Sequence, residues 1–300
     1  MSNTRILACE FDYFQPRTIE EAVNLMVKYG EKSSVLAGGT DLLVNMKIGR
    51  IAPAVIVDIR RIPDLERMNG QDGFSIGAAI KVRSVERSET IALKYTALAE
   101  AAGQLGPVQI RNMATICGNV CTASPSADSP PALLVFDAQA LIFGPSGERV
   151  VPLDQFFVSS KKTALGLAEL LIRIVLPEPP PGLGSAFLKV GRVAADVATV
   201  NAAVSLKRDD GCFRSCRIAL GSVTPRAIRS RPAEEALEGQ PYSVDLVEYA
   251  STLASMEVQP SKRARLGRST AEYRKSAIKS LVRDAIQRAW ERASEKRGER

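Results

Sequence analysis

Histidine is absent from the 300-residue sequence. This absence removes the commonest general base, the usual base of a catalytic triad and the commonest zinc ligand. Hydrolytic or metal chemistry carried by the chain's own side chains is therefore disfavoured, and we expect neither catalytic residues nor a metal site. Chemistry supplied by a bound cofactor fits this composition better.

Long apolar runs and a secretion signal are also missing. No stretch approaches the roughly 20 apolar residues that a membrane-spanning helix needs, and the N-terminus lacks a basic start followed by an apolar run and a cleavage site. The five cysteines are an odd number in a chain too long to depend on disulfides, which favours reduced thiols. We therefore expect a cytoplasmic protein without a membrane span.

Aromatic residues make up only 5% of the chain and do not alternate with its basic residues, many of which lie between Lys262 and Arg300. A single-stranded nucleic-acid site combines the two, so we expect no nucleic-acid partner. Apolar residues from Ile278 to Trp290 recur at helical spacing. This pattern predicts an amphipathic helix with a solvated basic face, which could also dock an acidic partner subunit.

Hydrophobic residues make up 45% of the chain, enough for a buried core, and its length suggests two or three domains. Residues 1–60 predict a small α/β subdomain. Its first helix is capped by Thr18 and ends at Gly30, and a second helix begins near Asp41. Strands are predicted at residues 35–37 and 54–59, the second with the continuous apolar character of a buried parallel strand.

Residues 61–178 predict an α+β subdomain with antiparallel pairing. Alternation from Phe74 indicates a half-buried strand, residues 84–105 are mostly helical, and a hairpin turns at residues 145–147. The segment "PEPPPGLG" (177–184) predicts a linker, because its prolines and glycines suit no element interior. It separates a C-terminal domain at residues 185–292.

The C-terminal domain is predicted to combine an antiparallel sheet with helices. Its strands form a meander that turns at residues 209–211. Helices are expected after Pro232, Ser243 and Ser269.

Two glycine-bearing segments could hold a phosphate group: Gly38-Gly39-Thr40, which follows the first predicted strand, and "ATICGNVCTASPSAD" (114–128). Glycine lets the backbone approach a ligand closely, and successive N–H groups in such turns form an anion-binding concavity. Neither segment is specific, since each is also an ordinary tight turn. No G-x-G-x-x-G or GK[ST] signature is present, so a nucleotide site here belongs to another fold.

Four segments together resemble the FAD-binding medium subunit of molybdenum hydroxylases, the family of carbon monoxide and xanthine dehydrogenases. They are "VLAGGTDLLVNMK", "IRNMATICGNVCTASPSADSPPALLVFDA", "FLKVGRVAADVATVNAAV" and "AEYRKSAIKSLVRDAI". The resemblance covers nearly the whole chain. It implies a two-subdomain FAD-binding fold of the vanillyl-alcohol-oxidase (PCMH) type over residues 1–178, with a C-terminal domain of antiparallel sheet and helices.

The resemblance also implies which residues contact FAD. The pyrophosphate is wrapped from one side by Ala37, Gly38, Gly39, Thr40 and Asp41, and from the other by Thr115, Gly118 and Asn119. Leu36 is also expected among the cofactor-binding residues.

Four further residues match positions at which the family contacts FAD. Asp128 bonds hydroxyls on a sugar or the ribityl chain, although a helix N-cap is an equally good interpretation. Lys189 lies near the pyrimidine edge of the flavin, or is a solvated strand lysine. Leu171 contacts the ring through its backbone, and Leu105 stands where some relatives place an aromatic over the adenine; both also suit a core.

Cysteine interrupts the second glycine segment. Relatives often read T-I-G-G-N, whereas Cys117 here replaces the first glycine and adds a Cβ. Cys117 and Cys121 do not have C-x₂-C spacing; we expect a strand that places both on one face. The cysteine-rich insertion that holds an extra iron–sulfur cluster in 4-hydroxybenzoyl-CoA reductase is missing.

The resemblance implies an electron-transfer oxidoreductase subunit. A large subunit would carry the molybdenum cofactor and oxidise an aromatic, heteroaromatic or similar substrate. A small subunit would relay electrons through two [2Fe-2S] clusters to the FAD of this chain, which passes them to NAD, a quinone or an electron carrier. The expected assembly is a dimer of heterotrimers. Alternatives are a flavin-free scaffold subunit, a stand-alone FAD oxidoreductase and a nucleic-acid-binding protein.

Overall fold

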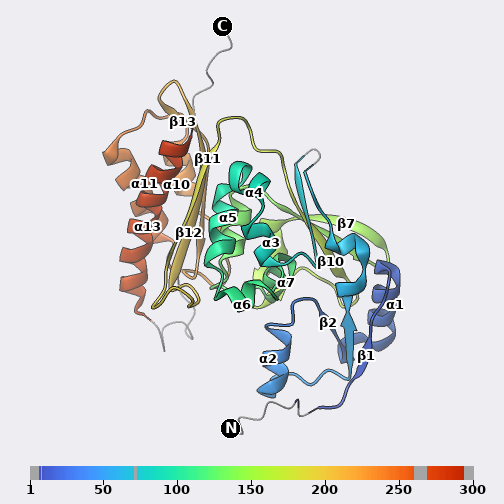
Figure 1. Cartoon of the computed structure of the whole chain (residues 1–300). Helices are drawn as coiled ribbons and strands as arrows, with labels where there is room; N and C mark the ends of the chain where they lie inside the picture. Colours follow the sequence, from blue (N-terminus) through green and yellow to red (C-terminus); the bar gives the residue numbers. More distant parts are fainter. Residues whose placement is uncertain (1–6, 8, 71–72, 260–268, 294–300) are drawn as a thin grey trace.

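The protein is described by a computed structural model at residues 7, 9–70, 73–259 and 269–293. The basic residues at 262–268 and 294–300 therefore lie outside the described residues. The described chain forms sheets of three, five, four and two strands with helices around them (Figure 1). This mixed α+β architecture is the predicted fold class.

The N-terminal unit is a three-stranded parallel sheet in the order β1-β3-β2. Its elements are β1 (Asp12–Phe14), α1 (Ile19–Tyr29), η1 (Gly30–Lys32), β2 (Ser33–Leu36), α2 (Leu42–Lys47) and β3 (Val55–Asp58). Thr18 caps α1 by accepting a hydrogen bond from the Glu21 N–H, and Gly30 ends the helix with a φ of 54°. The predicted α/β pattern of this region is confirmed.

The middle unit is a five-stranded antiparallel sheet in the order β4-β5-β10-β6-β7. Its strands are β4 (Met68–Asn69), β5 (Phe74–Gly77), β6 (Gln139–Gly144), β7 (Gly147–Pro152) and β10 (Leu170–Leu176). The predicted hairpin at residues 145–147 joins β6 to β7. The antiparallel pairing and this hairpin are confirmed.

Helices fill the long connection between β5 and β6. They are α3 (Val82–Glu86), α4 (Glu89–Lys94), α5 (Thr96–Gln104), α6 (Val108–Arg111), α7 (Ile116–Thr122) and α8 (Ser129–Leu134). Shorter elements are η2 (Ile59–Arg61), η3 (Pro63–Glu66), α9 (Leu153–Phe156), β8 (Phe157–Ser159) and β9 (Lys162–Thr163). The mostly helical character predicted for residues 84–105 is thus confirmed.

The C-terminal unit is a four-stranded antiparallel sheet in the order β11-β12-β13-β14, with its helices on one face. Its elements are β11 (Gly184–Val190), β12 (Val200–Asp209), β13 (Cys212–Gly221), β14 (Ile228–Arg229), α10 (Arg231–Leu237), α11 (Val244–Met256) and α13 (Ala271–Arg292). The predicted amphipathic helix is α13, which buries its stripe from Ile278 to Ala289 against β11 and β12. Gly184 permits this approach, because a Cβ there would lie 2.0 Å from the Ala289 carbonyl oxygen.

The C-terminal sheet stands between α13 on one side and α5 on the other (Figure 1). Successive strand residues point to opposite faces, so Ala202 and Val204 join the core with α13 while Ala203 joins the core of the middle unit. Phe187 and Ala219 extend this second contact. The C-terminal sheet therefore packs directly against the middle unit, which carries the second glycine segment.

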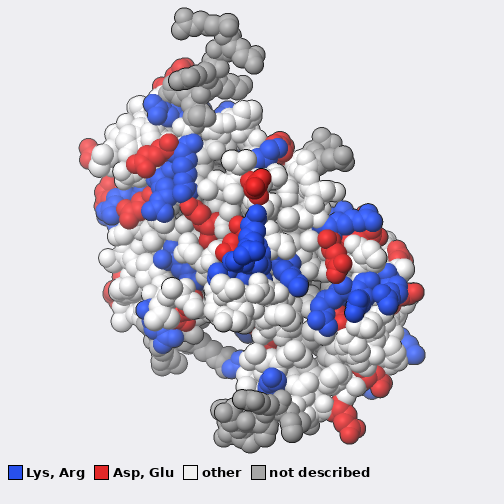
Figure 2. Space-filling model, viewed as in Figure 1, with Lys and Arg blue, Asp and Glu red and all other residues white. Residues whose placement is uncertain are grey.

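On the face shown in Figure 2, basic side chains lie in several separate groups with acidic side chains beside them. Within the described residues, no helix is long and apolar enough to cross a membrane.

Candidate functional site

A cavity of about 530 Å³ lies where the N-terminal unit meets the middle unit. Its walls come from the β2–α2 loop, residues 105–128, the start of β10 and a loop after β11. The volume falls within the roughly 300–1,000 Å³ typical of small-molecule sites. The fold therefore brings both glycine segments to one ligand-sized space.

Most of the predicted site residues line this cavity. They are Ala37, Gly38, Gly39, Thr40, Asp41, Leu105, Thr115, Gly118, Asn119, Asp128 and Leu171. Two predicted residues do not line the cavity. Leu36 belongs to a small core with Met46 and Ile56. Lys189 pairs with Asp128, and only 4% of its side chain is exposed.

The first glycine segment presents unpaired donors to the cavity. Within the described part of the chain, the backbone N–H groups of Gly38, Gly39, Thr40 and Asp41 have no hydrogen-bond acceptor. Gly38 packs so closely that a Cβ would lie 2.4 Å from the Met113 carbonyl oxygen, and Gly39 has a φ of 73°. This bare turn can therefore bring several N–H groups to an anion.

The second segment is a helix start, which corrects the expectation of a strand. Thr115 caps α7 by accepting from the Gly118 N–H at 3.0 Å, so Cys117 and Cys121 lie on a helix, four residues apart. This spacing also places both on one face, and both line the cavity. Cys117 has ordinary helical backbone geometry, so its Cβ is accommodated without a left-handed conformation.

Asp128 is a buried carboxylate of the cavity wall that accepts two side-chain hydrogen bonds. Its Oδ2 accepts from Lys189 Nζ at 2.7 Å and its Oδ1 accepts from Asn201 Nδ2 at 3.0 Å. Burial raises the pKa of Asp128 above its usual value, and the Lys189 ammonium and the Asn201 amide oppose that shift. Asp128 does precede α8, but its side chain makes no capping hydrogen bond.

Acidic side chains in the cavity wall are each bonded to a neighbour, as Asp128 is. Asp41 Oδ2 accepts from the Thr122 hydroxyl at 3.2 Å, which joins the two glycine segments. Glu169 pairs with Arg149 at 2.5 Å, and Asp196 pairs with Arg192 at 2.6 Å. No lysine or arginine is among the lining residues of the described chain. An anion in the cavity would therefore depend on backbone N–H groups, while these pairings limit repulsion from the carboxylates.

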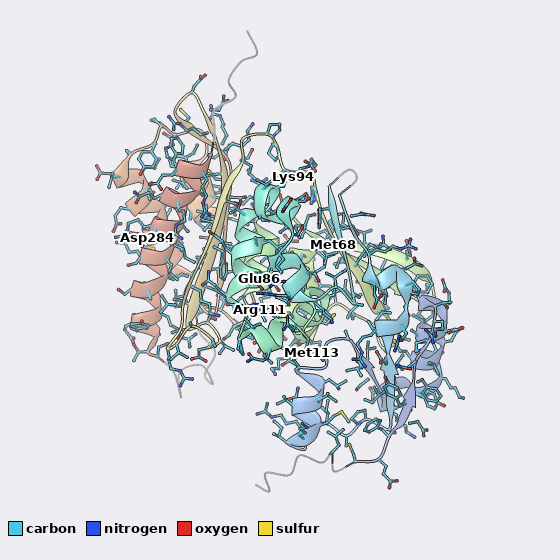
Figure 3. All side chains as sticks on the ribbon, in the orientation of Figure 1. Met68, Glu86, Lys94, Arg111, Met113 and Asp284 are labelled. Carbon is cyan, nitrogen blue, oxygen red and sulfur yellow. The ribbon has the colours of Figure 1, made fainter. Side chains whose placement is uncertain are left out.

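An ion pair outside the cavity holds part of its wall. Arg111 on α6 donates to Glu86 on α3 at 2.9 Å and to the Gly106 carbonyl at 2.6 Å. Figure 3 shows Glu86 and Arg111 next to each other, with Met113 close to α2. Gly106, Pro107 and Ile110 line the cavity, so this pair fixes the segment that faces the first glycine turn.

Several lining residues were not predicted from the sequence: Thr122, Glu169, Asp196 and Val197. Thr122 was detectable in principle, because it lies one helical turn after Gly118. Glu169 and Asp196 carry no local signal, since their place depends on where β10 and β11 lie in the folded chain.

Known protein families match nearly the whole chain. Residues 9–179 match the FAD binding domain in molybdopterin dehydrogenase, and residues 185–289 match the CO dehydrogenase flavoprotein C-terminal domain.

Individual relatives are similar along nearly their full length. The chain is 34% identical to the carbon monoxide dehydrogenase medium chain of Afipia carboxidovorans, covering 94% of this chain and 98% of that one. It is 31% identical to the xanthine dehydrogenase FAD-binding subunit of Escherichia coli O157:H7, covering 92% and 95%. The solved carbon monoxide dehydrogenase of Hydrogenophaga pseudoflava superposes with a TM-score of 0.91 at 32% identity, covering 95% and 99%.

Proposed function

Because the chain belongs to the FAD-binding medium subunits of the molybdenum hydroxylase family, we propose that it carries electrons through FAD from a partner subunit to an external acceptor. Its similarity to dehydrogenase subunits over almost their full length makes it an FAD-binding oxidoreductase component. The observation that carries the proposal is the meeting of two glycine segments at one cavity, the first of which has unpaired N–H donors.

The residues of the cavity fit FAD chemically. The N–H groups of Gly38 to Asp41 are donors suited to the pyrophosphate oxygens, and the start of α7 at Thr115 lines the same cavity. The Asp128 carboxylate accepts hydrogen bonds from hydroxyls of the cofactor. Leu105 and Leu171 contribute apolar surface for its rings. Leu36 packs in the small core next to the first glycine turn. We also propose that Lys189, which bonds Asp128, contacts the flavin.

Bound FAD supplies chemistry that the side chains lack, since a flavin accepts electrons singly and releases them as a pair. We propose residues 1–178 as the cofactor-binding domain. Residues 185–292 form a second domain, which lines the cavity with Ala195, Asp196 and Val197 and bonds Asp128 through Lys189 and Asn201. The electron donor in this proposal is a small subunit with two [2Fe-2S] clusters, and the substrate is oxidised on a large molybdenum subunit. The assembly is a dimer of heterotrimers, and the acceptor is NAD, a quinone or an electron carrier.

The alternative function is that of a scaffold subunit that binds no flavin. Its sequence support was Cys117, and the structure places that residue in ordinary helical geometry with its thiol directed at the Ile76 carbonyl, 3.7 Å away. No feature of the described cavity favours the scaffold over a flavoprotein.

The test begins with purification of the chain and identification of any released flavin. We expect about one FAD per chain, and a deflavinated protein that regains FAD stoichiometrically. The partner subunits are then added with substrate, and flavin bleaching is followed before and after each candidate acceptor. A chain that stays colourless with and without its partners overturns the cofactor assignment. A flavin that its partners do not reduce overturns the electron-transfer route alone.

A further inference from the structure

Two neighbouring strands of the C-terminal sheet each donate a side-chain hydrogen bond to the Asp128 carboxylate. Lys189 on β11 and Asn201 on β12 are directly paired across the strands, so their side chains share one face. Lys189 bonds Asp128 Oδ2 at 2.7 Å and Asn201 bonds Asp128 Oδ1 at 3.0 Å. Asn201 is fully buried and does not line the cavity, whereas Asp128 does.

The orientation of the Asn201 amide is determined by its surroundings. Its Nδ2 donates to Asp128 and also to the Ala127 carbonyl at 3.1 Å, so a flipped amide would place an oxygen against two oxygens. The other end of the amide is less well satisfied, since Asn201 Oδ1 is buried without a hydrogen-bond partner in the described structure. A buried unpaired acceptor is destabilising, so the benefit of this amide lies in its two donor contacts.

The residue opposite Asn201 on β13 makes room for that amide. Gly221 pairs with Asn201 in the sheet, and a Cβ there would lie 2.0 Å from Asn201 Oδ1. The sheet thus combines a fully buried amide, a glycine that accommodates it and a charged partner on the adjoining strand.

We propose that Asn201 is a positioning residue for FAD, which acts by fixing the Asp128 carboxylate at the cavity wall. The inference rests on the proposed function. A carboxylate offers about four lone-pair directions, of which Lys189 and Asn201 use two. The remaining directions accept hydroxyl donors of the cofactor. Without Asn201, Asp128 loses one of its two anchors, and FAD binding must restore an orientation that the native chain holds in advance.

The same strand supplies a matched control. Ser205 lies four residues after Asn201 on the same face of β12, is 1% exposed, and donates to the Val135 carbonyl at 2.7 Å. It also joins the C-terminal sheet to the middle unit, but neither partner lines the cavity. Ser205→Ala therefore removes a buried hydrogen bond of the same kind away from the site.

The experiment is titration of deflavinated full-length chain with FAD, followed by flavin fluorescence and by visible circular dichroism of the bound flavin. Asn201→Ala is expected to raise the Kd about tenfold or more and to change the visible signal, because hydrogen bonds to charged groups are strong. Ser205→Ala is expected to leave both unchanged. Equal affinities of wild type and Asn201→Ala overturn the inference alone, whereas a wild-type chain that binds no FAD overturns the proposed function as well.

A double-mutant cycle separates positioning from general packing. If Asn201 acts through Asp128, adding Asn201→Ala to Asp128→Ala produces no further loss of FAD affinity. Additive losses contradict the inference. Should Asn201→Ala fail to fold, Asn201→Leu keeps the approximate shape of the side chain and removes both donor contacts without adding a buried charge, and the same Kd increase is expected; unchanged affinity in that variant overturns the proposal.

Discussion

Lys189 donates to Asp128 across 2.7 Å, and the side chains of both residues are about 95% buried. The pair joins β11 of the C-terminal sheet to the residue that precedes α8, at the wall of the cavity. Each side chain neutralises the other, and Lys189 also donates to the Gln104 carbonyl at 2.8 Å. The lysine is therefore not a solvated strand residue.

Breaking this pair is expected to destabilise the fold. Lys189→Met leaves a buried carboxylate without its counter-charge, which typically costs about 3–5 kcal/mol. Urea unfolding of the wild type and the variant measures the difference in the free energy of unfolding. The double variant Lys189→Met with Asp128→Asn removes both charges and is expected to regain most of the stability but not FAD binding. Recovery of FAD binding in the double variant would show that the Asp128 charge is not needed.

How much of the site the sequence could predict depends on whether each signal is local. The bare turn at Gly38 and Gly39 is local, because a strand, two glycines and a helix follow one another directly. The signal at Thr115 is local too, because its hydroxyl caps α7 by accepting from the N–H of Gly118, three residues later. The family resemblance added Asp128 and Lys189, which no spacing pattern would have connected.

The missed features depend on distant segments. In the sequence, Asn201 is one polar residue within a buried strand. Its role is visible only in the folded chain, where it contacts Asp128, which lies 73 positions earlier in the sequence. The expected strand at Cys117 was wrong because alternating apolar residues over a few positions fit a short helix equally well. Tertiary packing against β10 and the cap at Thr115 decide between the two.

Gly38→Ala is expected to abolish FAD binding, because the new Cβ would lie 2.4 Å from the Met113 carbonyl oxygen and 2.6 Å from the Ala114 Cα. Both contacts are backbone atoms, so the turn itself must move, at a cost of about 1–3 kcal/mol. FAD content of the purified variant and its melting temperature are the measurements. Gly103→Ala is the control, since its Cβ would have only one neighbour, at 3.9 Å. Normal FAD content in Gly38→Ala would contradict close approach at this turn.

Replacing Cys117 by glycine, the residue that the family resemblance led us to expect there, should destabilise the fold without improving FAD binding. Cys117 is 2% exposed inside α7, and glycine there loses buried volume and increases the flexibility of the unfolded chain. We expect Cys117→Gly to lower the free energy of unfolding by about 1–2 kcal/mol. Tighter FAD binding by this variant than by wild type or Cys117→Ala would mean that the Cys117 side chain does restrict the site.

The last prediction concerns Asp58, which ends β3 just before the lining residue Ile59. Burial alone would raise the pKa of Asp58, but hydrogen bonds from the Arg60 guanidinium, the Tyr13 hydroxyl, the Arg60 N–H and Gln15 together hold it well below the usual range. The folded state thus keeps this carboxylate ionised at pH values where the unfolded chain protonates it. Its stabilising effect is complete above the unfolded pKa of about 4 and is lost as the pH falls below that value.

Asp58→Asn removes this titration while keeping the shape of the side chain. At pH 7 we expect the variant to be less stable than wild type by about 1–3 kcal/mol, because two charged hydrogen bonds to Arg60 are weakened. The difference should narrow as the pH is lowered from 4 towards 2, since only the wild type loses the contribution of an ionised Asp58. Urea unfolding of both proteins at a series of pH values measures that difference. A gap that stays constant over this range would mean that Asp58 titrates normally in the folded protein and that its bonds to Arg60 and Tyr13 do not favour the ionised form.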